Sequence, residues 1–172
     1  MQHDLITTEK RERKGYLKTV LIVIAILLAM AILVLNVFTH LLSVVSYYGD
    51  GMEPNLSSGK TLLVSKTADI SEGDVIAFYY NNKVLVRRVI CSGGKQISID
   101  REGTVTINGT VLDEPYLEGK SIGLCNIEFP YYVTPDHMFV MGDNRAISMD
   151  SRLAEIGVIS QDRIIGKVLF VK

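Results

Sequence analysis

Side chains that could do chemistry are concentrated in one segment near the C-terminal end. Residues 142–152 read Gly-Asp-Asn-Arg-Ala-Ile-Ser-Met-Asp-Ser-Arg and bring two carboxylates, two guanidinium groups and two hydroxyls together. Carboxylates at this density suit a metal site or an acid/base pair. The same groups also suit a network of hydrogen bonds and ion pairs that holds loops against a β domain. The residues by themselves leave both interpretations open.

Cysteine and histidine offer little further chemistry. Cys91 could act as a nucleophile, but no motif places a histidine beside it. His137 follows Thr-Pro-Asp, which is typical of a turn before a strand. Cys91 and Cys125 are the only cysteines, too few for a four-ligand zinc site or a disulfide framework. A disulfide between them stays an alternative, and we expect two unpaired buried thiols.

The composition limits the class of protein. With 18 Lys plus Arg and 19 Asp plus Glu, the net charge is −1, so the basic excess that nucleic-acid binding needs is missing. A length of 172 residues fits one ordinary domain. The hydrophobic content of 48% is high and uneven, which excludes a wholly soluble chain. Frequent Val, Ile and Leu from residue 62 to 171 exclude disorder there.

The hydrophobic residues are concentrated in an apolar run near the N-terminus. Residues 20–35 read VLIVIAILLAMAILVL, and apolar residues continue to Leu42. This run exceeds the roughly 20 residues that cross a bilayer and the roughly 7–15 of a cleaved signal peptide. No Ala-x-Ala pattern follows it. We predict an uncleaved transmembrane signal anchor over residues 19–46, with cleavage within Ser43–Ser46 as the minor alternative.

Flanking charges set the expected orientation. Five basic residues precede the run, and the next one after it is Lys60. Because basic residues stay on the cytoplasmic side, residues 1–18 are expected in the cytoplasm and residues 47–172 outside. The expected protein is a single-pass protein of the cell membrane with an extracellular C-terminal domain.

The outer domain has the pattern of short strands. Residues 101–103 form a hairpin turn with a glycine, and Asn81-Asn82-Lys83 forms a second turn. The expected strands cover residues 61–65, 74–80, 84–90, 96–100, 104–108, 131–133, 138–141 and 164–171. No long helical period follows residue 46. The fold class is therefore mainly β, an antiparallel barrel or sandwich beside one N-terminal transmembrane helix.

These motifs, in this order, resemble type I signal peptidases of Gram-positive bacteria. Residues 51–56, Gly-Met-Glu-Pro-Asn-Leu, resemble the family's Ser-Met-x-Pro-Thr-Leu box. Residues 72–78 resemble its Gly-Asp-Val box, residues 87–90 its Lys-Arg-Val-Ile box, and residues 107–117 its Asn-Gly and Glu-Pro-Tyr segment. Residues 142–152 match its Gly-Asp-Asn-Arg-x-x-Ser-x-Asp-Ser-Arg box. The resemblance runs from the anchor to the last strand and implies the family's β domain.

The departures fall on the chemistry of the family. The resemblance implies a serine nucleophile at Gly51 and a lysine base at Arg87. Glycine has no side chain to attack a carbonyl, and arginine stays protonated in proteins. Residues 91–95 also replace the family's Gly-Leu-Pro-Gly-Asp with Cys-Ser-Gly-Gly-Lys. The resemblance therefore implies a retained scaffold with no catalytic residues.

No neighbouring residue replaces the missing pair. Asp50 would need a second carboxylate to hydrolyse an amide, and Ser57 and Ser58 lie too far past Pro54. Ser148 holds the position where the family orients its lysine. We expect Asp50, or Ser148 with a backbone carbonyl, to approach Arg87 and fill the cleft. The expected vestigial binding site comprises Asp50, Gly51, Met52, Pro54, Arg87 and Ser148.

The resemblance implies structural roles for the remaining motif residues. It favours the ion-pair network over a metal site, so no metal and no cofactor are expected. The expected structural residues are Asp74, Gly142, Asp143, Asn144, Arg145, Asp150, Ser151 and Arg152.

Two functions from different classes follow. The first is a catalytically inactive relative that serves as a membrane-anchored chaperone or accessory factor in sortase-dependent pilus assembly, with a pilin subunit or the pilus sortase as partner. Its binding site would be the family's substrate groove, where an extended peptide adds to a strand edge. The alternative is an active type I signal peptidase, a serine endopeptidase with a non-standard dyad. A decoy or regulator of the genuine signal peptidase is a third hypothesis.

Overall fold

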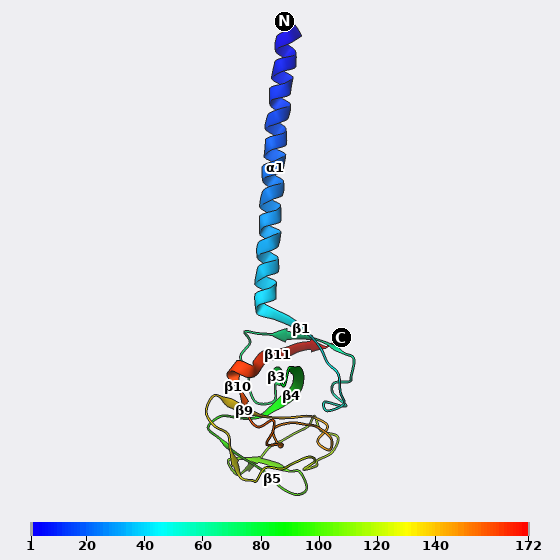
Figure 1. Ribbon diagram of the computed structural model, residues 1–172, viewed down its shortest axis with the longest axis vertical. Helices are drawn as coiled ribbons and strands as arrows, with labels where there is room; N and C mark the ends of the chain where they lie inside the picture. Colours follow the sequence, from blue (N-terminus) through cyan, green and yellow to red (C-terminus); the bar gives the residue numbers. More distant parts are fainter. Residues whose placement is uncertain (1, 172) are drawn as a thin grey trace. The chain divides into compact units, whose positions relative to one another are not determined.

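The computed structural model describes the backbone of residues 2–171 and the side chains of residues 15–169. The chain divides into two units, residues 1–40 and residues 41–172. The first unit is a single helix, α1 (Gln2–Leu41) (Figure 1). Within it, Gly15–Leu41 contains an 18-residue window whose mean hydropathy is 3.2, and no part of this window is buried in the protein. A helix of this length and composition can cross a membrane, which agrees with the predicted anchor.

The second unit is built from two antiparallel sheets. The larger has the strand order β1-β2-β11-β3-β4-β9-β10, and the smaller has the order β7-β6-β5-β8. The strands of the larger sheet are β1 (Leu42–Ser46), β2 (Thr61–Ser65), β3 (Val75–Tyr80), β4 (Lys83–Ser92), β9 (His137–Met141), β10 (Ile159–Ser160) and β11 (Ile164–Val171). Those of the smaller sheet are β5 (Gln96–Ile99), β6 (Val105–Ile107), β7 (Thr110–Val111) and β8 (Tyr131–Tyr132). A 3₁₀ turn, η1 (Gln161–Arg163), precedes β11.

Turn residues fix the register of the hairpins. Asn81 and Asn82 between β3 and β4 have φ values of 45° and 59°. Positive φ at both central residues belongs to the turn whose twist matches the paired strands, and asparagine tolerates it. The hairpin pairs Ile76 with Arg87 and Val75 with Arg88. The turn thus determines which of the two arginines lies on which face of β4.

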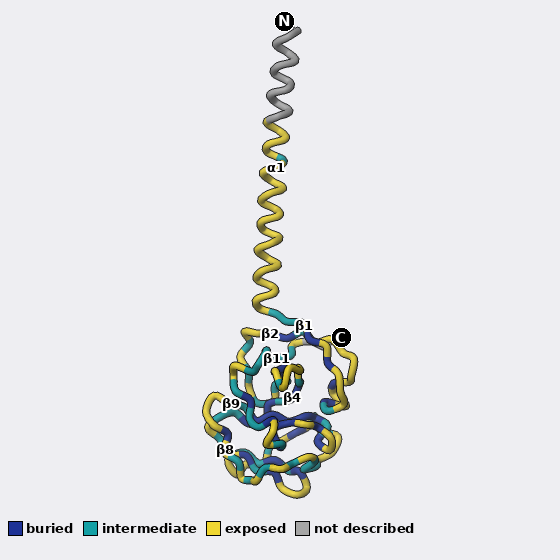
Figure 2. The backbone as a smooth tube through the Cα atoms, viewed as in Figure 1, coloured by how far each residue is buried: buried dark blue, intermediate teal, exposed yellow. Residues whose placement is uncertain are grey.

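Three apolar clusters make up the core of the β unit (Figure 2). One of them contains Val45 of β1, Tyr47 and Met52 of the following loop, and Val86 of β4. The loop after β1 is therefore packed against the middle of β4 by apolar contacts. This packing brings residues 51 and 87 together.

The predicted fold class is confirmed: one N-terminal apolar helix and antiparallel sheets. One boundary differs, because residues 42–46 were assigned to the anchor and instead form strand β1, paired with β2. The apolar run passes without a break from helix into strand, so hydropathy does not mark the change. The two-residue strands β7 and β10 were also not predicted, since so short a segment has no periodicity.

Candidate functional site

Gly51 and Arg87 lie in direct contact in the folded unit. A Cβ atom on Gly51 would lie 3.1 Å from Nη2, 3.2 Å from Cζ and 3.3 Å from Nη1 of Arg87. These distances are shorter than ordinary van der Waals contact. The guanidinium group of Arg87 therefore occupies the space that a side chain at position 51 would need.

The hydrogen-bond acceptors of this guanidinium are neutral. Arg87 donates from Nε to the carbonyl of Met149 at 2.9 Å and from Nη1 to the carbonyl of its neighbour Val86 at 2.6 Å, and Tyr47 lies beside it. The residue is 6% exposed. Burial lowers the pKa of Arg87, and the negative charge of Asp150 only partly opposes this effect. Arginine still keeps its proton at physiological pH, so a positive charge is buried here.

The expected contact between Asp50 and Arg87 is not formed. Asp50 is exposed, and none of the ion pairs among the described side chains joins it to Arg87. The guanidinium instead reaches the carbonyl of Met149, so only the backbone-carbonyl part of that expectation agrees with the structure. Asp50 stands in an exposed turn, where water solvates its carboxylate better than a buried pair would.

Ser148 lies near the Gly51 carbonyl, against Gly142. A Cβ atom on Gly142 would lie 2.1 Å from the Ser148 Oγ and 2.2 Å from the Gly51 carbonyl oxygen. Only glycine fits at position 142 for that reason. The Ser148 hydroxyl is buried and has no hydrogen-bond partner within the described part of the chain. A buried polar atom without a partner is rare in folded proteins.

Asp150 and Arg152 form the buried support below this contact. Arg152 binds both Asp150 oxygens, from Nε at 2.8 Å and from Nη2 at 2.7 Å, and the amide of Gly142 donates to the same carboxylate at 3.0 Å. Arg152 also donates to the carbonyls of Ile122 and Arg145. Both side chains are fully buried. Asp150 is thus committed to Arg152 and the backbone.

Two further ion pairs complete the network. Asp143 accepts from Arg88 at 2.8 and 2.5 Å and from the Asn55 amide at 2.9 Å. Arg145 pairs with the buried Glu114. The guanidinium of Arg88 lies 4.1 Å from the centre of the Tyr116 ring, and the Tyr116 hydroxyl donates to Glu114 at 2.7 Å. Burial and Glu114 together raise the pKa of Tyr116, so its hydroxyl stays protonated as this donor requires.

The remaining motif residues have structural contacts. The backbone N–H of Asn144 donates to the Gly51 carbonyl at 3.0 Å, and the Ser151 hydroxyl accepts from the backbone N–H of Val140 at 3.0 Å. Asp74 forms an ion pair with Lys167 at 2.8 Å. Met52 is fully buried and donates its amide to the Tyr47 hydroxyl. Among the described residues, no group of three His, Cys, Asp or Glu side chains is placed to hold a metal ion.

The divergent loop at residues 91–95 has an anchor of its own. Glu72 accepts from the Ser92 amide and from the Lys95 ammonium group, both at 2.8 Å. A Cβ on Gly93 would lie 2.5 Å from the Thr134 carbonyl oxygen, so the loop packs tightly against the segment before β9. A glutamate–lysine pair therefore holds this loop.

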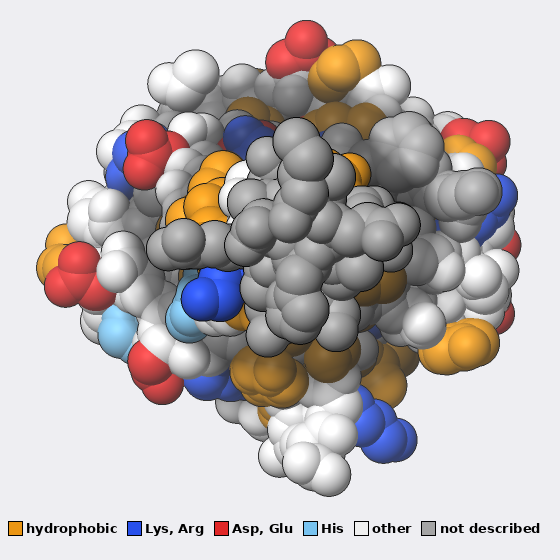
Figure 3. Space-filling model, turned by 90° about the horizontal axis from the view of Figure 1, so that it is seen from above, with side chains coloured by type: hydrophobic (Ala, Val, Ile, Leu, Met, Phe, Trp, Pro, Cys, Tyr) orange, Lys and Arg blue, Asp and Glu red, His pale blue; other side chains and the backbone are white. Residues whose placement is uncertain are grey.

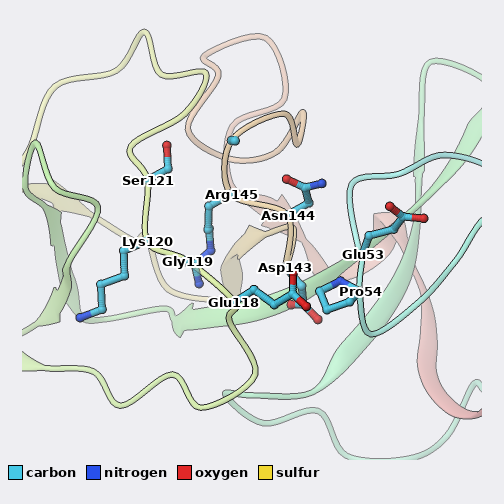
Figure 4. Close-up of a pocket in the computed structure, with 10 residues that line it drawn as sticks. Glu53, Pro54, Glu118, Gly119, Lys120, Ser121, Asp143, Asn144 and Arg145 are labelled. Carbon is cyan, nitrogen blue, oxygen red and sulfur yellow. The ribbon is translucent and has the colours of Figure 1, made fainter.

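A cleft of about 320 Å³ lies beside the network (Figure 4). Glu53 and Pro54 form one wall, residues 118–121 form the other, and residues 143–146 lie between them. Gly51 and Arg87 are not among its lining residues. Pro54 thus lines this cleft, whereas the contact between Gly51 and Arg87 lies outside it.

The charges on the face seen in Figure 3 and the two cysteines of the described residues show no second catalytic centre. On the face seen in Figure 3, acidic and basic side chains are interspersed instead of gathered by sign. Cys91 and Cys125 are both free thiols, Cys91 buried and Cys125 only partly buried. Burial, followed by the negative charge of Glu72, raises the pKa of Cys91 to about 11. Its thiolate, the nucleophilic form, is therefore scarce at neutral pH.

Three functional positions were not identified from the sequence. Tyr47 contacts both Arg87 and the Met52 amide, and Glu72 holds the divergent loop. Glu114 was quoted within a motif, but its pairing with Arg145 was not foreseen. Spacing gave no signal for these contacts, because each joins segments that only the folded sheet brings together.

Comparisons with known proteins agree with this architecture. The family model described as signal peptidase, peptidase S26, matches residues 16–172. The chain is 34% identical to signal peptidase I T of Bacillus subtilis, over 95% of this chain and 89% of that protein. It is 34% identical to signal peptidase IB of Staphylococcus aureus, over 71% and 73% of the two chains.

A solved structure gives the same result. A crystal structure of a signal peptidase I from Enterococcus faecalis superposes with a TM-score of 0.50 at 28% identity, covering 60% of this chain and 98% of that one. The family model alone extends over far more than half of the sequence. The chain therefore belongs to the signal peptidase family, peptidase S26.

Proposed function

We propose that this protein is a catalytically inactive member of its family that binds an extended peptide at the outer membrane surface without cutting it. The observation that carries the proposal is the contact between Gly51 and Arg87, where a guanidinium group fills the space of a nucleophile side chain. The homologues are named signal peptidases, and the proposal departs from those names at these two residues.

Hydrolysis of an amide needs a nucleophile and a group that takes its proton. Gly51 supplies no atom for attack, and Arg87 holds its proton. The nearest hydroxyls do not replace them. Ser148 is buried and has no hydrogen-bonded base in the described part of the chain, and the hydroxyl of Tyr47 accepts from the Met52 amide. Burial raises the pKa of Tyr47, which makes it a poorer nucleophile still.

Two strand edges near Gly51 support peptide binding. Strand β1 is the last strand of its sheet and pairs only with β2. Residues 83–87 of β4 pair with β3 on one side, whereas the pairing with β9 begins at Arg88. Unpaired amides and carbonyls along such edges can hydrogen-bond an extended chain. This binding uses the backbone and needs neither a serine nor a lysine.

The biological role we propose is that of a membrane-anchored chaperone or accessory factor in sortase-dependent pilus assembly. The partner is a pilin subunit, the pilus sortase, or both. The support is the resemblance to inactive relatives that have one anchor and both dyad positions replaced. The apolar helix of residues 15–41 is consistent with a membrane anchor. Binding at the membrane would hold a tethered partner close to the place of assembly.

The names of the relatives favour one alternative, an active signal peptidase that cleaves secreted preproteins. A cleavage assay decides between the two functions. Full-length protein in detergent micelles is incubated with a signal-peptide substrate from pH 5 to pH 10, beside signal peptidase I T of Bacillus subtilis as positive control. We expect no product above the buffer rate. Turnover that survives Asp50→Ala and Ser148→Ala would overturn the inactive assignment.

A genetic experiment tests the role in assembly. Deletion of the gene should abolish pilus polymers on the cell surface while secreted preproteins are still processed normally. Wild-type protein supplied in trans should restore the polymers. Accumulation of unprocessed preproteins in the deletion strain would instead support the peptidase alternative.

A further inference from the structure

We propose that Arg87, together with Ser148, forms a binding site for a carboxylate group of an extended peptide. The inference rests on the proposed function, because it names the chemical group that the inactive site would recognise. In this proposal, the positive charge of Arg87 selects a negatively charged ligand at the position where the family cleaves its substrate.

The first argument is charge balance. Arg87 and Arg152 bring two buried positive charges to this region, and Asp150 is the one buried carboxylate that acts on both among the described residues. Both Asp150 oxygens are already held by Arg152, and one also accepts from the Gly142 amide. Arg87 has no ion pair of its own in the described part of the chain. A buried cation that faces neutral groups binds an anion more strongly than an exposed one, since its solvation is already lost.

The second argument is the number of donors. A guanidinium group has five N–H bonds, and hydrogen bonds to the carbonyls of Met149 and Val86 use one on Nε and one on Nη1. Nη2 takes part in none of the hydrogen bonds found among the described residues. A carboxylate accepts two parallel hydrogen bonds from a guanidinium better than any neutral group does.

The third argument is Ser148, which is independent of the charge. Its hydroxyl is 99% buried by residue exposure and lacks any partner in the described chain. Its Oγ and the carbonyl oxygen of Gly51 would both lie within 2.2 Å of a Cβ atom built on Gly142, so the two oxygens are near each other. A ligand oxygen bound beside Gly51 would provide an acceptor for this donor. Donors of Ser148 and Arg87, which come from two segments, thus lie near Gly51.

The site lies just beneath the surface. Arg87 retains 6% exposure, and Met149, whose carbonyl it binds, is 52% exposed. Asp50 is also exposed and opposes a carboxylate by its own negative charge. Removal of the Asp50 charge should therefore strengthen carboxylate binding, whereas removal of the Arg87 charge should weaken it.

The experiment compares matched labelled hexapeptides of alanine and serine by fluorescence anisotropy, with full-length protein in neutral detergent. One peptide ends in a free carboxylate and its twin in an amide. A second pair, both amidated, carries glutamate or glutamine at the fifth position. We expect at least tenfold tighter binding of the carboxylate member of one pair. The pair that discriminates identifies the source as a chain end or an acidic side chain.

The variants assign the effect to this site. Arg87→Met should remove the discrimination, whereas Arg101→Met, which deletes a cation from the exposed β5–β6 turn, should leave it unchanged. Ser148→Ala should weaken carboxylate binding about threefold, and Asp50→Asn should strengthen it about threefold. The two wild-type comparisons need no variant, so they remain decisive if Arg87→Met does not fold.

Equal binding within both pairs, or binding of none of the four peptides up to millimolar concentration, would overturn the carboxylate site. Cleavage of any peptide would overturn the inactive assignment instead, and it is detected separately by mass spectrometry of the same samples. Failure of the proposed function and failure of this inference therefore give different results.

Discussion

Residues 51 and 87 are packed against each other. Gly51 has no side chain, and the long side chain of Arg87 fills the space that one would occupy. Serine at position 51 would place its Cβ 3.1–3.3 Å from the Arg87 guanidinium, so either the loop or the guanidinium would have to move. Lysine at position 87 lacks the planar terminal group and would release that space. The two positions are therefore energetically coupled, and their substitutions should not be additive.

We expect Gly51→Ser alone to lower the free energy of unfolding by about 1–3 kcal/mol, because a packed site gains volume. Gly51→Ser combined with Arg87→Lys should recover at least half of this loss. Urea denaturation of full-length protein in detergent measures both effects. Gly119→Ser is the control, since a Cβ there meets no atom within 4 Å. Additive losses in the double variant would contradict the coupling.

At the scale of elements, the connection between β4 and β5 shows how a divergent segment keeps its place. Glu72 holds the Ser92 amide and the Lys95 ammonium group, and it comes from the loop before β3. Burial disfavours the charged form of Glu72, but these hydrogen bonds outweigh it and lower its pKa below 4.5. A group with a lowered pKa stabilises the fold above its unfolded-state pKa, and this stabilisation is lost as the pH falls through the folded-state value.

We expect Glu72→Gln to lower the free energy of unfolding by about 0.5–1 kcal/mol at pH 7, a small value because both partners are partly solvated. The difference from wild type should stay constant down to about pH 5 and shrink below about pH 4.5. Denaturation curves at several pH values measure it. Glu102→Gln, in the exposed β5–β6 turn, should show no such profile. A difference that grows on acidification would refute the role of Glu72.

At the scale of the whole molecule, the chain joins a helix that can cross a membrane to a β unit with its own core. Strand β1 begins directly after the last residue of α1. Chain connectivity therefore keeps the open edge of β1 within a few residues of the end of the helix.

We predict that protease added to intact protoplasts degrades the β unit and spares the first 18 residues. The reason is that five basic residues precede the apolar run and none follows before Lys60, which favours a cytoplasmic N-terminus. Immunoblots with tags at each end measure the outcome, and detergent-permeabilised cells are the control in which both tags are lost. A protected C-terminal tag would reverse the orientation.

Sequence patterns were informative where a signal is local. Hydropathy located the apolar helix, since about 20 apolar residues in a row are what a helix needs to cross a bilayer. Alternation and turn residues such as Asn81-Asn82 located the main strands, because turn geometry depends on a few neighbouring residues. The same patterns misplaced residues 42–46, where an apolar segment is equally suited to helix and strand.

The sequence by itself determined the fold class and two chemical properties, the missing side chain at Gly51 and the permanent charge at Arg87, because these belong to the residues. Only the tertiary structure decided which groups meet these two residues. It directed the guanidinium to the carbonyl of Met149 and away from Asp50, and it left the Ser148 hydroxyl without a partner among the described residues. The physical reason is that burial and hydrogen bonding depend on groups far apart in the chain. The free energies of burial and of hydrogen bonding at these residues depend on how the sheets pack, because packing brings those groups together.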